Sequence, residues 1–262
     1  MTATVPVTRR AEDGVAWLGF NRPAQANAID VPLATAFRDI VTDLAADSTC
    51  RVVVLSGDAR FFSAGGDVRA MISASSPAEY LRELVDILHQ GINILAESQL
   101  IVVAEVDGSA AGAGFSLVLN TDLAIASSNA TFLTAYGAAG LTPDTGMSAL
   151  LPQIVGPRRA NELLFLGRKL DAATALDWGI INEVVPAGAL RERVIAVATA
   201  IAHGPFPALA ETKRLLRSGR SVGYKDQLAD EADTIVAAIG SDAARERIGA
   251  FTQRSSSHST QS

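Results

Sequence analysis

Two apolar runs of strand length constrain the fold of this 262-residue chain more than any other feature. Residues 51–56 read Arg-Val-Val-Val-Leu-Ser, and residues 100–104 read Leu-Ile-Val-Val-Ala. Neither run alternates apolar with polar residues, which is typical of strands that are buried on both faces. Because apolar residues make up 48% of the chain, enough of them remain to cover both faces of such a sheet.

Amphipathic stretches alternate with these runs in the first two thirds of the chain, whereas helical patterns dominate its end. Further strands are expected at 15–20, 123–126 and 184–185. Helices are expected at 32–45, 77–96, 115–119, 158–166, 171–177, 191–202, 208–216 and 226–251. This order predicts an α/β core over residues 1–190 and a helical region over 191–254. The Ser-rich end, 255–262, is expected to be disordered.

Composition narrows the classes of function. The single cysteine, Cys50, leaves no internal disulfide and fits a reducing compartment, so we expect a cytoplasmic protein. With three histidines at no helical spacing, no metal site is expected. A net charge of −6 without a basic run disfavours nucleic acid, and no apolar run approaches the roughly 20 residues that span a membrane. A small-molecule ligand is the remaining expectation.

Small side chains and one isolated carboxylate mark a candidate site. Every residue from Gly108 to Gly114 is Gly, Ala or Ser, so a ligand can reach the backbone amides there. Asp144 stands between Pro143 and Thr145 in an otherwise uncharged run. Bare amides with one carboxylate indicate a site that stabilises negative charge and moves a proton. The alternative is that the glycines only allow close packing and that Asp144 caps a helix.

Two motifs carry a family resemblance. Phe62-Ser-Ala-Gly-Gly-Asp-Val68 and Asp107-Gly-Ser-Ala-Ala-Gly-Ala-Gly114 resemble the paired oxyanion-hole signature of the crotonase, or enoyl-CoA hydratase/isomerase, superfamily. The likeness extends to Phe20-Asn-Arg-Pro23, to Gly140-Leu-Thr-Pro-Asp144 and to Ala172–Val185. It implies a crotonase-like spiral of β-β-α units whose C-terminal helical region forms a homotrimer or a dimer of trimers.

The resemblance also implies a ligand. The substrate would be an acyl-CoA thioester, and coenzyme A would arrive with it rather than as a separate cofactor. The thioester oxygen would accept hydrogen bonds from the backbone N–H groups of Gly66 and Ala113. Further residues expected to contact the substrate are Ala24, Ala26, Ala64, Gly65, Asp67, Val68, Gly112 and Tyr136. Tyr136 is expected either to line the acyl pocket or to hydrogen-bond Asp144.

The residues at the family's catalytic positions favour one reaction. A hydratase of this family uses two carboxylates, and their positions correspond here to Ser116 and Tyr136. Neither is an acid, so efficient hydration by that mechanism is not expected. Asp144 lies where some isomerases of the family carry an Asp that moves a proton between two carbons of an enoyl chain. One carboxylate suffices for this reaction, since it takes a proton and returns it.

Two other functions stay open. In the family's aryl-CoA dehalogenases, an Asp equivalent to Asp144 attacks the ring and a His equivalent to His89 acts as base. His89 flanks the apolar stripe of its helix, so it is either such a base or an ordinary half-buried residue. A member that binds acyl-CoA without converting it is the third alternative.

Overall fold

The computed structural model describes residues 5–242 and 244–250 and divides the chain into two compact units. The first unit extends to His203 and the second begins at Gly204. The core was expected to end at residue 190, but helix α7 (Leu190–Ala202) packs against strands of the first unit and belongs to it. Its inward residues are fully buried, as expected of a core helix.

The first unit is built on a six-stranded sheet in the order β1-β2-β3-β5-β7-β10. The strands are β1 (Val7–Glu12), β2 (Val15–Phe20), β3 (Val52–Ser56), β5 (Ile101–Val106), β7 (Leu123–Ser127) and β10 (Glu183–Val185). β1 runs antiparallel to β2, and the other neighbours are parallel. The two apolar runs that constrained the fold are the adjacent central strands β3 and β5, which confirms the α/β prediction.

A second sheet of four short strands was missed by the sequence patterns. It consists of β4 (Phe61–Ser63), β6 (Ser109–Ala111), β8 (Thr131–Leu133) and β9 (Leu170–Asp171). β4 and β6 hold only three residues each, too few to show a strand pattern in the sequence. Their parallel pairing, with Phe61 opposite Ser109, brings the two small-residue motifs side by side.

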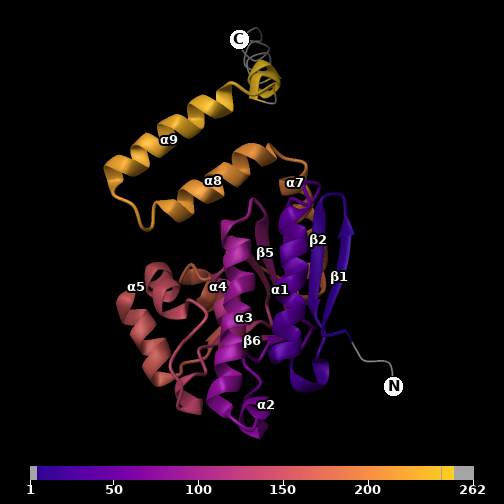
Figure 1. The fold of residues 1–262 in the computed structure, drawn as a ribbon, viewed down its shortest axis with the longest axis vertical. Coiled ribbons are helices and arrows are strands. Elements are labelled where there is room, and N and C mark those ends of the chain that lie inside the picture. Colours follow the sequence, from indigo (N-terminus) through magenta and orange to yellow (C-terminus); the bar gives the residue numbers. More distant parts are fainter. Residues whose placement is uncertain (1–4, 243, 251–262) are drawn as a thin grey trace. The chain divides into compact units, whose positions relative to one another are not determined.

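Two long helices pack together over the sheet. α1 (Val31–Ala46) and α3 (Pro77–Glu97) lie side by side in Figure 1 and match the predicted helices within one residue at either end. At their closest approach, a Cβ on Gly91 would lie 2.8 Å from Cε1 of Phe37. Glycine is therefore required at residue 91, because any side chain would push α3 away from α1.

Four further helices lie between strands of the first unit. They are α2 (Val68–Ser73), α4 (Ala113–Leu119), α5 (Met147–Leu166) and α6 (Ala172–Asp177). α5 begins eleven residues before the helix expected at 158–166, and it is kinked at Gly156, where the φ angle is +78°. Prolines at 152 and 157 had hidden the first part of this helix from the sequence pattern.

The second unit contains a pair of helices, α8 (Phe206–Ser218) and α9 (Tyr224–Ile239). Arg214 of α8 forms two hydrogen bonds with the carboxylate of Asp230 on α9, at 2.7 and 2.8 Å. The helix expected over 226–251 is interrupted after Ile239, and residues 242 and 244–250 are helical again. Residue 251 and the tail expected to be disordered, 255–262, lie outside the described residues.

Three further features bear on function. No single described helix is both long and apolar enough to span a membrane, and the successive segments Ala187–Ala202 and Phe206–Ser218 meet that test only as a pair. Within the described part of the chain, no group of three or more His, Cys, Asp or Glu side chains is placed to hold a metal ion. Burial raises the pKa of the Cys50 thiol, which therefore stays protonated.

Candidate active site

The two small-residue motifs meet through their glycine backbones. Gly65 adopts a φ angle of +90°, which favours glycine. A Cβ on Gly65 would lie 2.8 Å from the carbonyl oxygen of Ala111 and 3.1 Å from the nitrogen of Ala113. No side chain fits at residue 65, so the absence of one lets the two motifs approach within van der Waals distance.

This approach leaves two backbone N–H groups without protein acceptors. Ile29 bonds to residues on both sides of Gly66: its N–H donates to Gly65 at 2.7 Å, and its carbonyl accepts from Asp67 at 2.8 Å. The N–H of Gly66 therefore faces away from Ile29. Ala113 is the first residue of α4, where N–H groups have no partner inside the helix. Within the described residues, neither amide donates to another protein group.

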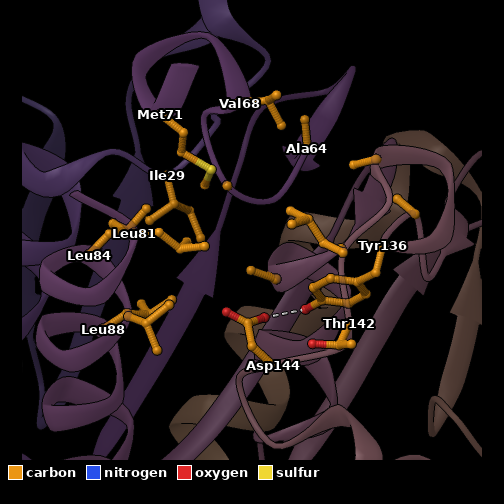
Figure 2. A pocket seen from close by; sticks show the side chains of 17 residues that line it. Ile29, Ala64, Val68, Met71, Leu81, Leu84, Leu88, Tyr136, Thr142 and Asp144 are labelled. Carbon is orange, nitrogen blue, oxygen red and sulfur yellow. Dashed lines mark hydrogen bonds between the residues drawn. The ribbon is translucent and has the colours of Figure 1, made fainter. Parts of the chain in front are cut away.

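Both residues line an apolar cavity of about 200 Å³. Its wall combines small residues of the two motifs, aliphatic side chains of α3 and the segment from Ala135 to Asp144 (Figure 2). The lining residues are Ile29, Ala64, Gly66, Val68, Met71, Leu81, Leu84, Val85, Leu88, Gly112, Ala113, Ala135, Tyr136, Ala139, Leu141, Thr142 and Asp144. Asp144 is the only ionisable carboxyl group among them.

Asp144 is held by the phenol of Tyr136. The hydroxyl of Tyr136 donates to Oδ1 of Asp144 at 2.6 Å and lies 3.0 Å from the hydroxyl of Ser116 (Figure 2). Tyr136 therefore both lines the cavity and bonds Asp144, the two roles expected of it. The alternative role of Asp144 as a helix cap is wrong, because α5 begins after Gly146 and receives no side-chain cap bond.

The surroundings of this pair stabilise the protonated form of Tyr136. Burial, together with the negative charge of Asp144, raises the pKa of the Tyr136 phenol well above its ordinary value. Tyr136 therefore keeps its proton at neutral pH and acts as the donor. The carboxylate accepts that bond at Oδ1, while its second oxygen points away from Tyr136 in Figure 2. The second oxygen of Asp144 is therefore left without a hydrogen bond from Tyr136.

Strained backbone flanks the pair on both sides. Ala135, just before Tyr136, has a φ angle of 60°, and Thr145, just after Asp144, has a φ angle of 56°. A left-handed conformation is unfavourable for a β-branched residue such as Thr145. The Thr145 hydroxyl is also buried without a hydrogen-bond partner. Strain of this kind persists where the surrounding structure imposes it, and here it fixes the directions of both side chains.

His89 lies beside this strained turn rather than in the cavity wall. Its Nε2 accepts a hydrogen bond from the backbone N–H of Thr145 at 3.2 Å. That nitrogen therefore carries no proton and is occupied by a backbone donor. His89 therefore lies close to the turn that follows Asp144, and it supports the backbone of that turn.

The remaining predicted residues divide between the cavity and its surroundings. Ala64, Val68 and Gly112 line the cavity, whereas Ala24, Ala26, Gly65 and Asp67 do not. Asp67 instead caps α2 through the N–H of Ala70 and pairs with Arg22 at 3.0 Å. Burial raises the pKa of Asp67, but the Ala70 amide and Arg22 outweigh it and hold that pKa below its ordinary value.

Sequence reasoning missed the role of Arg22. Its guanidinium pairs with Asp30 at 2.9 Å as well as with Asp67, and it also donates to the carbonyl of Ala28. It thereby ties the segment before α1 to the residue that follows Gly66. Arg22 belongs to the Phe-Asn-Arg-Pro motif, which was the available signal, but nothing in the sequence showed which carboxylates it contacts.

The fold and the paired amides define an acyl-CoA-processing enzyme of the crotonase fold. The family model for enoyl-CoA hydratase/isomerase matches residues 10–261, and the chain belongs to that family. An enoyl-CoA hydratase structure from Bacillus anthracis superposes with a TM-score of 0.90 at 26% identity, covering 95% of this chain and 96% of that one. One from Mycobacterium smegmatis gives 0.89 at 30% identity, covering 95% and 96%.

Curated relatives carry different reactions in their names. The chain is 32% identical to 4-chlorobenzoyl coenzyme A dehalogenase-2 of an Arthrobacter species, over 92% of this chain and 88% of that protein. It is also 32% identical to 1,2-epoxyphenylacetyl-CoA isomerase of Escherichia coli K12, over 95% and 96%. Family membership therefore fixes the acyl-CoA chemistry but not the reaction.

Proposed function

We propose that the protein is an enoyl-CoA isomerase that moves a carbon–carbon double bond along the acyl chain. Asp144 takes a proton from C2 of a 3-enoyl-CoA, and the electron pair moves onto the thioester oxygen. The N–H groups of Gly66 and Ala113 stabilise the resulting dienolate. The protonated Asp144 then returns the proton to C4 as the thioester carbonyl re-forms, which leaves the double bond between C2 and C3.

The observation that carries this proposal is the bond from Tyr136 to Oδ1 of Asp144. It fixes the carboxylate while leaving the second oxygen free, and a one-base proton shuttle requires such an oxygen. Hydration by the family's two-carboxylate mechanism is disfavoured, because no second acid lines the cavity in the described structure. The similarity to the Escherichia coli 1,2-epoxyphenylacetyl-CoA isomerase supports an isomerisation of an acyl-CoA thioester.

Turnover of a 3-enoyl-CoA tests the reaction. We expect 2-enoyl-CoA to form. It is detected by the absorbance of the conjugated thioester, and by chromatography with mass spectrometry as a product of the same mass as the substrate. We expect the same enzyme to add water to 2-enoyl-CoA at least about 100-fold more slowly, since general acid–base catalysis by a second group is missing. Fast formation of 3-hydroxyacyl-CoA, or tight binding with no conversion of any enoyl-CoA, contradicts the proposal.

A second candidate is an aryl-CoA dehalogenase or hydrolase. The similarity to the Arthrobacter dehalogenase favours it. Here Asp144 would attack the aryl carbon and expel halide, and water would then cleave the aryl ester. Rapid quench with 4-chlorobenzoyl-CoA, followed by intact-protein mass spectrometry, detects that ester. An adduct on Asp144 supports this candidate, halide release without an adduct excludes Asp144 as its nucleophile, and no release excludes the candidate itself.

We also propose that the protein assembles as a homotrimer. Helix α9 has no buried residue, and its apolar side chains Ile235, Val236 and Ile239 are more than half exposed. Exposed apolar faces of this kind are typical of subunit interfaces. Light scattering on purified protein is expected to give three times the chain mass of 27.3 kDa, or six times for a dimer of trimers. A monomer at micromolar concentration contradicts it.

A further inference from the structure

The wall facing Asp144 is aliphatic. Four residues of α3 spaced over two helical turns project toward the cavity, and Ile29 and Met71 extend the same wall (Figure 2). The α3 residues are Leu81, Leu84, Val85 and Leu88. Leu84 and Leu88 are almost fully buried, each at 3% exposure, so they cannot swing out of the way into solvent. The cavity therefore has a firm apolar limit on this side.

The cavity offers no counter-ion for a charged acyl group. No Lys, Arg or His is among its lining residues, and Tyr136 keeps its proton. A second carboxylate on the acyl chain would be buried without a partner beside Asp144, which is strongly unfavourable. A cationic group would pair with Asp144 and occupy the oxygen that takes the proton. The acyl group that fits is uncharged.

Volume sets the size of that group. An apolar protein cavity of about 150 Å³ holds one benzene molecule. The cavity of about 200 Å³ is larger by roughly the space of one or two methylene groups. An acyl group with a six-membered ring and two further carbons, or a linear chain of similar carbon number, fills it.

We infer that this site selects uncharged apolar acyl groups of about eight carbons, and that Leu88 of α3 sets the upper limit. This substrate class rests on the proposed acyl-CoA function of the same cavity. Each methylene that enters the cavity is expected to raise affinity about fourfold, and carbons beyond the limit are expected to add nothing. Phenylacetyl and octanoyl groups share this chemistry, and their CoA thioesters distinguish a ring from a linear chain.

Calorimetric binding of acyl-CoAs that carry no double bond to move tests the inference. We expect affinity to rise from butyryl- through hexanoyl- to octanoyl-CoA and to level or fall at dodecanoyl-CoA. Phenylacetyl-CoA is expected within about tenfold of octanoyl-CoA, and the dicarboxylic adipyl-CoA at least about tenfold weaker than hexanoyl-CoA. Affinity that climbs steadily to dodecanoyl-CoA, is independent of the acyl group, or is equal for adipyl- and hexanoyl-CoA overturns the inference.

Substitutions at two residues of α3 test whether Leu88 sets the upper limit on the length of the acyl group. Leu88→Ala enlarges the cavity, so its preferred chain is expected to be longer by about two carbons. Leu95→Ala is the matched control, because Leu95 is also a buried leucine of α3 but does not line the cavity. Equal chain preferences in the two variants contradict the role of Leu88. Since none of these ligands can isomerise, octanoyl selection without turnover of 3-octenoyl-CoA would refute the isomerase proposal alone.

Discussion

The hydroxyl of Tyr136 donates a hydrogen bond of 2.6 Å to Oδ1 of Asp144, across a loop that begins and ends at strained residues. A phenol that cannot readily lose its proton thus faces the carboxylate that we propose as the proton shuttle. We infer that Tyr136 orients Asp144 for the proton transfer proposed above. The predictions below test this arrangement.

Removing the hydroxyl alone measures its contribution. Tyr136→Phe keeps the ring in the cavity wall but leaves Oδ1 of Asp144 without its donor. Hydrogen bonds to charged groups contribute about 1.5–3 kcal/mol, so kcat is expected to fall about 10- to 150-fold. Steady-state kinetics with a 3-enoyl-CoA measures this change. Tyr224→Phe, at an exposed tyrosine of α9, is the control and should match the wild type.

The raised pKa of Tyr136 gives a prediction at high pH. Burial and the charge of Asp144 favour the neutral phenol in the folded state, so the folded protein retains a proton that the unfolded chain loses near pH 10. Stability is therefore unaffected below about pH 9 and falls as the pH rises above about 10. Tyr136→Phe should lack this part of the alkaline loss in urea titrations between pH 8 and 11. Identical slopes for both proteins would refute the assignment.

Substitution of His89 distinguishes a positioning role from a role as general base. Its Nε2 supports the backbone of Thr145, and a hydrogen bond between neutral groups contributes about 0.5–1.5 kcal/mol. His89→Ala is therefore expected to lower isomerase turnover only about 2- to 10-fold, whereas loss of a general base costs about 100- to 10,000-fold. His203→Ala, at an exposed histidine, controls for the substitution itself. A loss beyond about 100-fold would place His89 in the chemistry.

Substitutions at two glycines distinguish a requirement of catalysis from a requirement of packing. A Cβ on Gly66 would lie 2.5 Å from Cε of Met71, the mobile end of a flexible side chain. A Cβ on Gly114 would lie 2.4 Å from the backbone oxygen of Ser63, which cannot move as easily. Gly66→Ala should fold with a melting temperature within a few degrees of the wild type yet lose about 100-fold in turnover, since displaced reacting groups carry such a penalty.

Gly114→Ala should instead lower the melting temperature by at least about 5 °C, because overpacking costs about 1–3 kcal/mol and this contact involves backbone. Thermal denaturation followed by circular dichroism compares the two variants. If Gly66→Ala proves the less stable variant, or turns over normally, the amide at residue 66 is not part of the site.

The convergence of Gly66, Ala113 and Asp144 on one cavity was expected from the family resemblance that the two small-residue motifs carry. The central strands were also predictable, since strands buried on both faces need continuous apolar runs. The four-stranded second sheet was not, because its strands hold only two or three residues each. Hydrogen bonds between backbones form it, and these leave no side-chain pattern.

The contacts of Arg22 and His89 could not be predicted from the sequence, for a different reason. Arg22 joins Asp30 and Asp67, and His89 reaches a backbone N–H that is 56 residues away in the chain. Such contacts depend on where loops end in space, and a single sequence does not encode loop geometry in any local pattern. The division of the chain after His203 was likewise hidden, since α7 resembles the helices that follow it.

The proton-shuttle role of Asp144 is tested most directly by one isosteric substitution. Asp144→Asn keeps the size of the side chain and an oxygen that can accept from Tyr136, but it removes the group that takes the proton. We predict that this variant binds octanoyl-CoA within about threefold of the wild type while turnover of 3-octenoyl-CoA to 2-octenoyl-CoA falls at least about 100-fold. Turnover within tenfold of the wild type, at unchanged affinity, would contradict the role.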